Sequence, residues 1–258
     1  MTKAATRSMH WPVTLAFLLG PGERENLAPF LWPFRHWGGE VTVLDDSSSD
    51  RSADVLSALL GRCLGLRPDL VQVRTHALGG DFGAARNLLQ DSVSTPWVLM
   101  ADPDERWEEG LIASLPSLVE QLDQDRKTVC GFPRANFIEG VLVNDLPSSR
   151  WSPEGLLSAL PATSWPPRNR DTQYRLLRRE ERWTGRLHER PESLTSRPDR
   201  VVSLKDSWIL HNKSYFRQLR QDAYYKALGQ TLGMPDLESL LSPGPVPRVP
   251  GNPDGRVG

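Results

Sequence analysis

This sequence of 258 residues contains only two cysteines, no long apolar run and almost no net charge. The two cysteines, Cys63 and Cys130, do not form a C-x-x-C pair, so the sequence suggests no zinc site and favours free thiols in an intracellular protein. The apolar run Val13–Leu19 is too short to span a membrane, and no small-residue cleavage site marks it as a signal peptide. We therefore expect no transmembrane segment and interpret this run as a buried first strand.

The formal net charge of −1 argues against a protein that binds nucleic acid or membranes through its overall charge. A chain this close to neutrality has no global basic field that would draw it onto nucleic acid or an anionic membrane. Arginine is nevertheless abundant between Arg168 and Arg190, so a local basic patch stays open. We expect a cytoplasmic protein, and peripheral contact with a membrane remains compatible with the sequence.

Apolar strands and helices alternate through the first half of the sequence. Strands are predicted at Val13–Leu19, Glu40–Leu44, Leu70–Val73 and Trp97–Ala101, and helices at Glu23–Trp37, Asp81–Asp91 and Glu108–Gln121. A further helix carries one apolar face made of Val55, Leu56, Leu59, Leu60, Cys63 and Leu64. This alternation predicts βαβ units and a parallel sheet, whose carboxyl strand ends lie along one edge, where ligands bind. The expected fold class is α/β, with a Rossmann-like, mostly parallel central sheet flanked by helices.

The second half of the sequence is less regular. Strands are predicted at Thr128–Arg134, Gln173–Arg178 and Val201–Leu210, followed by a helix at Lys213–Gly229. Residues 145–170 are rich in proline, serine and tryptophan and are interpreted as a long functional or mobile loop. The last 25 residues, 234–258, contain six prolines and four glycines, which predicts a disordered tail.

Acidic residues follow the second predicted strand in the segment E-V-T-V-L-D-D-S-S-S-D at Glu40–Asp50. A carboxylate at a strand end can accept hydrogen bonds from a base N–H or from ribose hydroxyls. Serine and aspartate are also favoured helix N-caps, which is the simpler interpretation of the segment. Both can hold, with Ser49 or Asp50 capping the helix and Asp46 facing a ligand.

A second acidic segment, A-D-P-D-E at Ala101–Glu105, follows the fourth predicted strand. Two carboxylates separated by one residue can hold a hard divalent cation, Mg²⁺ or Mn²⁺, which would bridge to a diphosphate. A solvated acidic turn is the alternative, and the position after a buried strand favours the metal. Between the two acidic segments lies D-F-G-A-A-R-N, Asp81–Asn87, where Arg86 can pair with a phosphate or brace a carboxylate, unless it is an ordinary surface arginine.

In this order the three segments resemble the family 2 glycosyltransferases of the GT-A fold, whose pattern runs D-D-x-S-x-D, then D-F-x-x-x-R-N, then D-x-D-E. The later stretch D-T-Q-Y-R-L-L-R-R-E-E-R-W-T-G-R-L-H-E, Asp171–Glu189, resembles a branch that builds lipopolysaccharide cores and related glycans. The resemblance covers roughly residues 13–228. It implies one GT-A domain over residues 1–230, with a nucleotide-sugar half at about 12–125 and an acceptor half at about 126–230.

The resemblance also implies an activity and a set of roles. A sugar would move, with inversion, from a nucleotide-diphosphate donor, usually a UDP-sugar, to a hydroxyl acceptor, with Mn²⁺ or Mg²⁺ as cofactor. Nucleotide-sugar-binding roles are implied for Glu23, Asp46, Asp81, Arg86, Asp102, Arg175 and Arg178. Asp104 is the implied metal ligand and Glu189 the implied catalytic base. His188 is either a second metal ligand, a brace for the diphosphate, or a structural histidine.

Two departures from the family pattern affect these roles. The usual opening P-x-x-N is replaced by L-G-P-G-E-R-E-N, so the contacts made by Glu23 are open. The E-D pair that many members carry as the base is absent, and L-H-E at Leu187–Glu189 is its best substitute.

Other classes of function fit the sequence less well. A dinucleotide-binding oxidoreductase would need a third glycine where Glu25 stands, and a sugar nucleotidyltransferase would need a Gly-rich, basic first loop. A non-catalytic nucleotide-sugar-binding protein would not need the retained D-x-D and H-E. The acceptor stays open among glycans, lipid-linked sugars, proteins, small molecules and nucleic-acid bases. Trp151, Trp165 and Trp183 can stack on a sugar or simply pack in the core.

Overall fold

The computed structural model describes residues 10–20, 23–46, 50–77, 79–147, 151, 156, 165–186 and 189–231. The predicted tail at 234–258, most of the predicted loop at 145–170, Ser47–Ser49 and His188 lie outside these residues. The chain divides into two compact units, Met1–Tyr215 and Phe216–Gly258. The predicted single domain over 1–230 stays a prediction.

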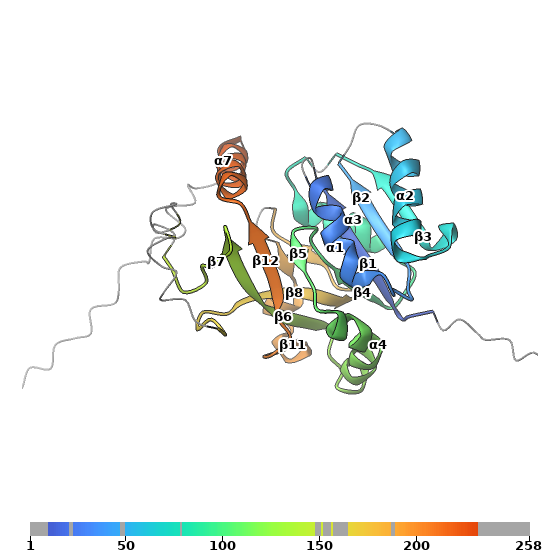
Figure 1. The fold of residues 1–258 in the computed structure, drawn as a ribbon. Coiled ribbons are helices and arrows are strands. Elements are labelled where there is room, and N and C mark those ends of the chain that lie inside the picture. The colour runs from blue at the N-terminus through green and yellow to red at the C-terminus, as the bar shows by residue number, and fades with distance from the viewer. Residues whose placement is uncertain are drawn as a thin grey trace, which may run out of the picture. The chain divides into compact units, whose positions relative to one another are not determined.

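Four parallel strands form the first half of the central sheet. They are β1 (Val13–Leu19), β2 (Val41–Asp45), β3 (Val71–Thr75) and β4 (Trp97–Met100), in the order β3-β2-β1-β4 (Figure 1). Every residue of β1, β2 and β4 is buried. Strands covered on both faces are expected to be apolar throughout, which is why these continuous apolar runs could be recognised as strands. The four predicted strands of this half are confirmed within two residues at each end.

Helices cover both faces of this half of the sheet. They are α1 (Leu27–Leu31), α2 (Asp50–Leu64), α3 (Phe82–Asp91) and α4 (Glu109–Gln124), with a short 3₁₀ helix, η3 (Pro68–Leu70), before β3. Alternate residues of β1 point to opposite faces. Leu15 and Phe17 pack in a core with α1, α2 and α4, whereas Ala16 and Leu18 pack in a second core with α3.

Two helix predictions were wrong in detail. The predicted helix Glu23–Trp37 is split into the 3₁₀ helix η1 (Arg24–Asn26), α1 and the 3₁₀ helix η2 (Trp32–Phe34). Pro33 explains the break after α1, because proline has no N–H to donate and its ring clashes with the preceding turn of an α-helix.

The apolar face predicted for α2 is narrower than expected. Leu56, Leu60 and Leu64 are buried, but Val55 is 69% exposed and Leu59 is 46% exposed. The three buried leucines are four residues apart and so lie on one stripe of the helix. Val55 and Leu59 each precede one of these leucines, and a step of one residue turns the side chain about 100° around the helix, here toward solvent.

The second half of the sheet is mixed. The strands are β5 (Glu105–Arg106), β6 (Val129–Ile138), β7 (Val141–Leu142), β8 (Asp171–Arg178), β11 (Val201–Ser203) and β12 (Ile209–Lys213). Strand β8 lies antiparallel between β4 and β6, and β12 is parallel to β6 on its other side. Strand β5 closes the order β4-β8-β6-β12-β5, while β7 and β11 also pair with β6. The predicted α/β fold with a mostly parallel central sheet flanked by helices is confirmed.

Small elements complete the described residues. A separate two-stranded sheet is formed by β9 (Trp183–Thr184) and β10 (Arg190–Pro191), followed by α6 (Ser193–Ser196) and the 3₁₀ helix η6 (Pro198–Arg200). Helix α7 (Tyr215–Thr231) provides the helix predicted at Lys213–Gly229 and, but for Tyr215, belongs to the second unit. Two of its large apolar side chains are exposed, Phe216 to 74% and Leu219 to 46%.

The predicted strand Val201–Leu210 is in fact two strands. The chain leaves the ladder at a bend around Lys205–Asp206 and returns as β12, which pairs with β6 further along. Strand β12 then continues to Lys213, beyond the predicted end. This extension brings His211 into the sheet, where it becomes part of the site described below.

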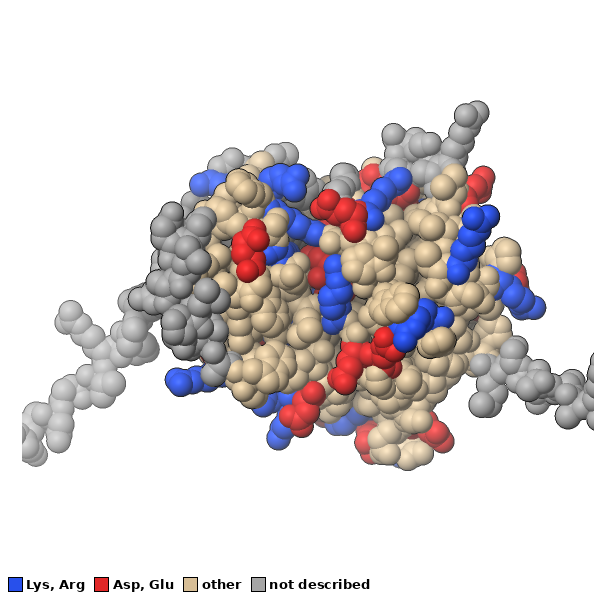
Figure 2. Space-filling view, in the orientation of Figure 1, with Lys and Arg blue, Asp and Glu red and all other residues tan. Residues whose placement is uncertain are grey.

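The surface and the helices carry two further features. Among the residues that the structure describes, no helix combines the length and the apolar composition needed to cross a bilayer. Acidic and basic side chains are interspersed over the face seen in Figure 2, with no extended area of one sign. This distribution agrees with the near-zero formal charge.

Gly39 permits a close approach between the turn before β2 and the start of β1. A Cβ at this position would lie 2.3 Å from the main-chain oxygen of Val13, which cannot move without disturbing the sheet. We expect Gly39→Ala to lower the free energy of unfolding by about 1–3 kcal/mol, the usual cost of overpacking. Urea denaturation measures this change. Gly20→Ala is the control, since its Cβ would meet only Glu23 Cγ at 3.9 Å, and an equal loss in both variants would contradict the steric explanation.

Candidate functional site

The acidic segments of the sequence meet at the carboxyl edge of the parallel strands. Asp45, the last residue of β2, is paired in register with Leu19, the last residue of β1. The backbone N–H of Asp46 donates to the Leu19 carbonyl at 2.9 Å, and the acidic turn after β4 begins at the same edge. Glu23 lies in the turn after β1, where its carboxylate accepts from Asn26 Nδ2 at 3.2 Å. Glu23, Asp46 and Asp102 are thus gathered at one edge, as their positions after strands predicted.

Two buried arginines hold the acidic turn after β4. Arg86, from α3, donates through Nη2 to Asp102 Oδ1 at 2.9 Å. Arg175, from β8, donates to the other oxygen of Asp102 and to Glu105 Oε1, the latter at 2.6 Å from Nη2 and 3.0 Å from Nε. The remaining oxygen of Glu105 accepts from the Asp102 N–H at 3.1 Å. Both carboxylates of the turn are therefore fixed by charge-assisted hydrogen bonds.

Burial and the charges of the two arginines shift the pKa values of the two carboxyl groups in opposite directions. Burial by itself would raise the pKa of Asp102, but Arg175 and Arg86 hold it below its ordinary value. Burial raises the pKa of Glu105 despite the opposing charge of Arg175. The pKa of Arg175 is raised by Asp102 and Glu105, which outweigh the effect of its own burial. Asp102 is therefore a firmly ionised carboxylate at neutral pH.

Arg86 also connects this turn to the predicted base. Its Nε donates to Glu189 Oε1 at 2.8 Å, and its guanidinium lies 5.1 Å above the ring of Trp183. The third nitrogen of the group, Nη1, is buried and has no hydrogen-bond partner among the described residues. A buried donor without a partner is costly, and a ligand oxygen or a water would relieve that cost.

The turn that leads to Glu189 is docked on the start of α3. Asp81 caps α3 by accepting from the Ala84 N–H at 2.9 Å, and its other oxygen pairs with Arg186 Nε at 3.3 Å. The Phe82 N–H donates to the Arg186 carbonyl at 2.9 Å. Gly83 makes this contact possible, because a Cβ there would lie 2.2 Å from the Gly185 carbonyl oxygen. Asp81 thus anchors the segment that carries Glu189.

Asp104 lies against a histidine that the sequence analysis did not single out. Its Oδ2 is 2.9 Å from His211 Nε2 and 3.8 Å from Lys213 Nζ. The other ring nitrogen of His211, Nδ1, is 2.8 Å from Asn136 Oδ1. Asn136 Nδ2 donates in turn to Asp171 Oδ2 at 3.0 Å. Strands β12, β6 and β8 therefore each contribute one side chain to a hydrogen-bonded chain that ends at Asp104.

The charges along this chain are set by its surroundings. Burial would raise the pKa of Asp171, but Arg134, whose Nη2 lies 2.6 Å from Asp171 Oδ2, and the hydrogen bonds from Asn136 hold it below its usual value. Burial lowers the pKa of His211, although Asp104 opposes this effect. At neutral pH, Asp171 is accordingly an ionised acceptor and His211 a neutral imidazole.

One feature of the sequence could have indicated His211 as a site residue. The run L-H-N-K comes at the end of the predicted strand Val201–Leu210, and polar residues at strand ends were the basis of the other site predictions. His188, the predicted second metal ligand, lies outside the described residues. Within the described ranges, no group of three or more histidine, cysteine, aspartate or glutamate side chains is arranged to hold a metal.

Arg178 is not part of this cluster. It pairs in register with Trp97, the first residue of β4, and therefore lies at the opposite edge of the sheet from Asp102. Its guanidinium forms an ion pair with Asp123 and stacks 5.0 Å above the Trp97 ring. Arg175, three residues earlier, lies at the carboxyl edge and is the one of the two arginines that reaches the acidic turn.

The three tryptophans considered as sugar platforms have different surroundings. Trp183 is buried in the core beneath Arg86, and Trp151 packs in a small cluster with Val143 and Leu156. Trp165 is 56% exposed and lies 5.1 Å from the ring of Trp208. Trp183 and Trp151 thus pack against the protein, whereas Trp165 is largely accessible.

Comparisons with solved structures give distant likenesses. The crystal structure of S. aureus TarS residues 1–349 in complex with UDP is 16% identical, with 80% of this chain and 62% of that chain covered and a TM-score of 0.45. The corresponding complex with UDP-GlcNAc is 17% identical, with 78% and 58% covered and a TM-score of 0.41. A longer structure of S. aureus TarS is 14% identical, with 80% and 38% covered and a TM-score of 0.43. The chain therefore spans less than two thirds of the length of these proteins.

Sequence comparison identifies the family directly. No curated protein matches the chain at a significant level. The profile described as glycosyl transferase family 2 matches residues 25–184, which is more than half of the chain and includes the acidic turn, Arg86 and Arg175. The chain belongs to glycosyl transferase family 2.

Proposed function

We propose that the enzyme transfers a sugar, with inversion and with the help of a divalent metal, from a UDP-sugar to a hydroxyl acceptor. The observation that carries the proposal is the pairing of Asp104 with His211 at the end of a buried hydrogen-bonded chain. The metal would bind at this pair, the nucleotide at the carboxyl edge of the sheet, and the acceptor near Glu189.

The hydrogen-bonded chain sets the tautomer of His211. Asp171 is ionised and can only accept, so the Asn136 amide must turn its NH₂ group toward Asp171. The amide oxygen then faces His211 Nδ1, which must carry the ring proton. The lone pair of Nε2 is left pointing at Asp104 Oδ2, so that two acceptors lie 2.9 Å apart.

This arrangement suits a metal ion. In octahedral coordination with bonds of about 2.1 Å, adjacent ligand atoms lie about 3 Å apart, close to the separation of Asp104 Oδ2 and His211 Nε2. A ligating histidine usually donates its other ring N–H to a carbonyl or carboxylate, as His211 does to Asn136. A carboxylate oxygen suits both Mn²⁺ and Mg²⁺, whereas an imidazole nitrogen is typically a ligand of transition-metal ions, so the pair favours Mn²⁺ over Mg²⁺. Bound there, either ion would neutralise the charge of the departing diphosphate.

The nucleotide would occupy the edge lined by Glu23, Asp46 and Asp102. Asp46 is suited to accept from the base, and Asp102, held in place by two arginines, from the ribose. Nη1 of Arg86 is a buried donor that has no partner among the described residues, and a ligand oxygen would satisfy it. UDP is the carrier most often used in the family that the sequence resembles.

Glu189 is proposed as the base that removes the acceptor's proton. One of its oxygens is held by Arg86, and the other has no hydrogen bond within the described residues, which leaves it to accept from a hydroxyl. As the acceptor oxygen attacks the anomeric carbon, the bond from that carbon to the diphosphate breaks on the opposite face of the sugar, and the proton passes to Glu189. Arg86 links Glu189 to Asp102, so base and donor site share one rigid support.

The proposal also covers the acceptor and the location of the enzyme. The acceptor is expected to be a glycan or a lipid-linked sugar, as in the lipopolysaccharide-core branch that Asp171–Glu189 resembles, and a cytoplasmic location stays a prediction. Trp165 is exposed and could stack on such an acceptor. The ordered Asp104–His211 pair and the oriented Glu189 favour an active transferase over a non-catalytic binding protein.

Removal of the metal ligand provides the first test. We expect the wild type to bind UDP in the presence of Mn²⁺, and Asp104→Asn to weaken this binding at least tenfold, about 1.4 kcal/mol. Calorimetry with and without Mn²⁺ measures both affinities, and Asp54→Asn, an exposed acid on α2, is the control. If the wild type binds none of the uridine, guanosine, cytidine and thymidine diphosphates with Mn²⁺, the proposed donor site is wrong.

The role of the hydrogen-bonded chain is tested at Asn136. Asn136→Ala should weaken Mn²⁺ binding in the presence of UDP about 10- to 100-fold, as is usual when the partner of a ligating histidine is lost. Electron paramagnetic resonance of bound Mn²⁺ measures this without an activity assay. Asn212→Ala, one residue beyond His211 on the exposed face of β12, is the matched control. Unchanged Mn²⁺ affinity in Asn136→Ala would show that the tautomer is not fixed in this way.

The base is tested by Glu189→Gln, which keeps an acceptor for Arg86 but cannot take a proton. With water as acceptor, release of UDP from a UDP-sugar should fall about 100-fold or more, while UDP affinity stays unchanged. Glu192→Gln, an exposed position just after β10, is the control. Wild-type turnover by Glu189→Gln would exclude Glu189 as the base.

A further inference from the structure

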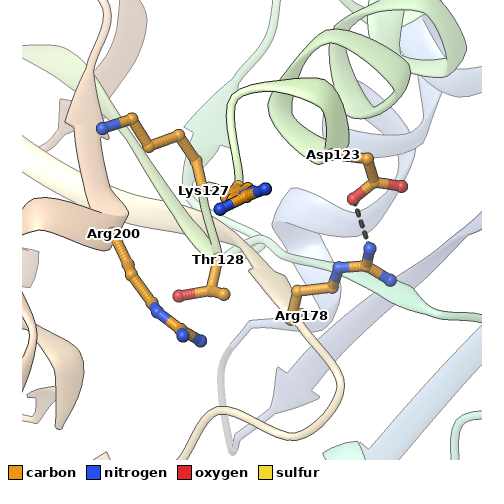
Figure 3. Close-up of a pocket in the computed structure, with 6 residues that line it drawn as sticks. Asp123, Lys127, Thr128, Arg178 and Arg200 are labelled. Atoms are coloured by element: carbon orange, nitrogen blue, oxygen red, sulfur yellow. Dashed lines mark hydrogen bonds and ion pairs between the residues drawn. The ribbon is translucent and has the colours of Figure 1, made fainter.

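A basic cavity lies away from the acidic cluster. Its volume is about 300 Å³, at the lower end of the range for small-molecule sites. Figure 3 shows the labelled side chains of Lys127, Thr128, Arg178 and Arg200 arranged around an open space, with Asp123 at one side. The full lining consists of Asp123, Arg126, Lys127, Thr128, Arg178 and Arg200.

This cavity is separate from the proposed donor site. Thr128 immediately precedes β6, Arg200 immediately precedes β11, and Arg178 pairs with the first residue of β4. All three positions therefore lie at the edge formed by the amino ends of β4, β6 and β11, whereas Asp102 and Asp104 follow the carboxyl end of β4. Arg175 and Arg178 are three residues apart on β8, which separates them by about 10 Å along the strand.

The charge of the cavity is strongly positive. Four cationic side chains and one acidic side chain line it, so its net charge is +3. Asp123 is already paired with Arg178, which is held in position by stacking on Trp97. Lys127 is likewise held, because its Nζ donates to the Asp199 carbonyl at 2.7 Å. Two of the four cations are thus fixed in place by the protein.

Three other polar side chains of the cavity have no protein partner in the part of the chain that the structure describes. Arg126 and Arg200 have no side-chain hydrogen bond or ion pair within the described residues, and both are exposed. Thr128 Oγ1 is buried and has no hydrogen-bond partner among these residues. In Figure 3 the Thr128 hydroxyl points toward the side of the cavity where Arg200 lies. A buried hydroxyl in a cavity that is also lined by two guanidinium groups without partners among the described residues is a combination that an oxyanion would satisfy.

We propose that this cavity is a second anion site, which binds the phosphate group of a small molecule. Guanidinium groups present pairs of N–H donors that match the oxygens of a phosphate, and Arg126 and Arg200 would supply them. The Thr128 hydroxyl would donate to a further oxygen, and Lys127 and Arg178 would add positive charge. The site requires neither the metal nor the nucleotide of the proposed donor site.

Inorganic pyrophosphate is the probe for this site, titrated into the full chain by calorimetry with EDTA present. We expect the wild type to bind it, and the double variant Arg126→Ala/Arg200→Ala to bind at least tenfold more weakly. Thr128→Val, which removes only the hydroxyl, should also weaken binding. The matched control is Arg62→Ala/Lys205→Ala, which removes two exposed cations elsewhere and should bind pyrophosphate as the wild type does.

Three results would overturn the proposal. They are absence of pyrophosphate binding by the wild type, equal weakening in the two double variants, and retention of wild-type affinity by Arg126→Ala/Arg200→Ala. UDP binding with Mn²⁺ is measured on the same variant and should be unchanged, which separates the two sites. If pyrophosphate and UDP affinities fall together, the pyrophosphate was bound at the donor site and the second site does not exist.

Discussion

The buried contact of Arg175 with Asp102 and Glu105 is the interaction on which the site depends. Arg175 is 4% exposed and Glu105 is fully buried, so neither charge can be compensated by water. Removal of one partner from such a cluster typically costs about 3–5 kcal/mol, because the other charges stay buried and unpaired. The contact ties the turn after β4 to β8 across the sheet. Asp104, between the two held carboxylates, is thereby presented in a fixed position.

Two further groups of side chains depend on this turn. On one side, Arg86 connects Asp102 to Glu189, and the docking of the 185–186 turn on α3 limits where Glu189 can lie. On the other side, His211 is aligned with Asp104 through Asn136 and Asp171. The side chains that hold Glu189 and Asp104 in place, Arg86, Asn136, Asp171 and His211, all lie on strands or helices, which gives the site a rigid support.

The direction of β8 separates two electrostatic environments. Because β8 runs antiparallel to β4, its first residues lie beside the carboxyl edge of the parallel strands and its last residue beside the amino edge. Arg175 is consequently paired with carboxylates, whereas Arg178 lines a cavity in which cationic side chains outnumber acidic ones. One short strand therefore carries one arginine to the edge that holds the acidic turn and another to the basic cavity at the opposite edge of the sheet.

Local sequence was sufficient for the elements whose signal is local. The largely apolar β1, the acidic residues after β2 and β4, and Arg86 on its helix could all be predicted, because each depends on neighbours within a few residues. The partners of Asp104 could not, since His211 lies 107 residues away and Asn136 lies 75 residues from His211, and pairing between distant strands leaves no local pattern. The same holds for the division between Arg175 and Arg178. The sequence by itself determined which side chains are available at the strand ends. Only the tertiary structure decided which of these side chains meet, because their contacts depend on the direction and register of distant strands.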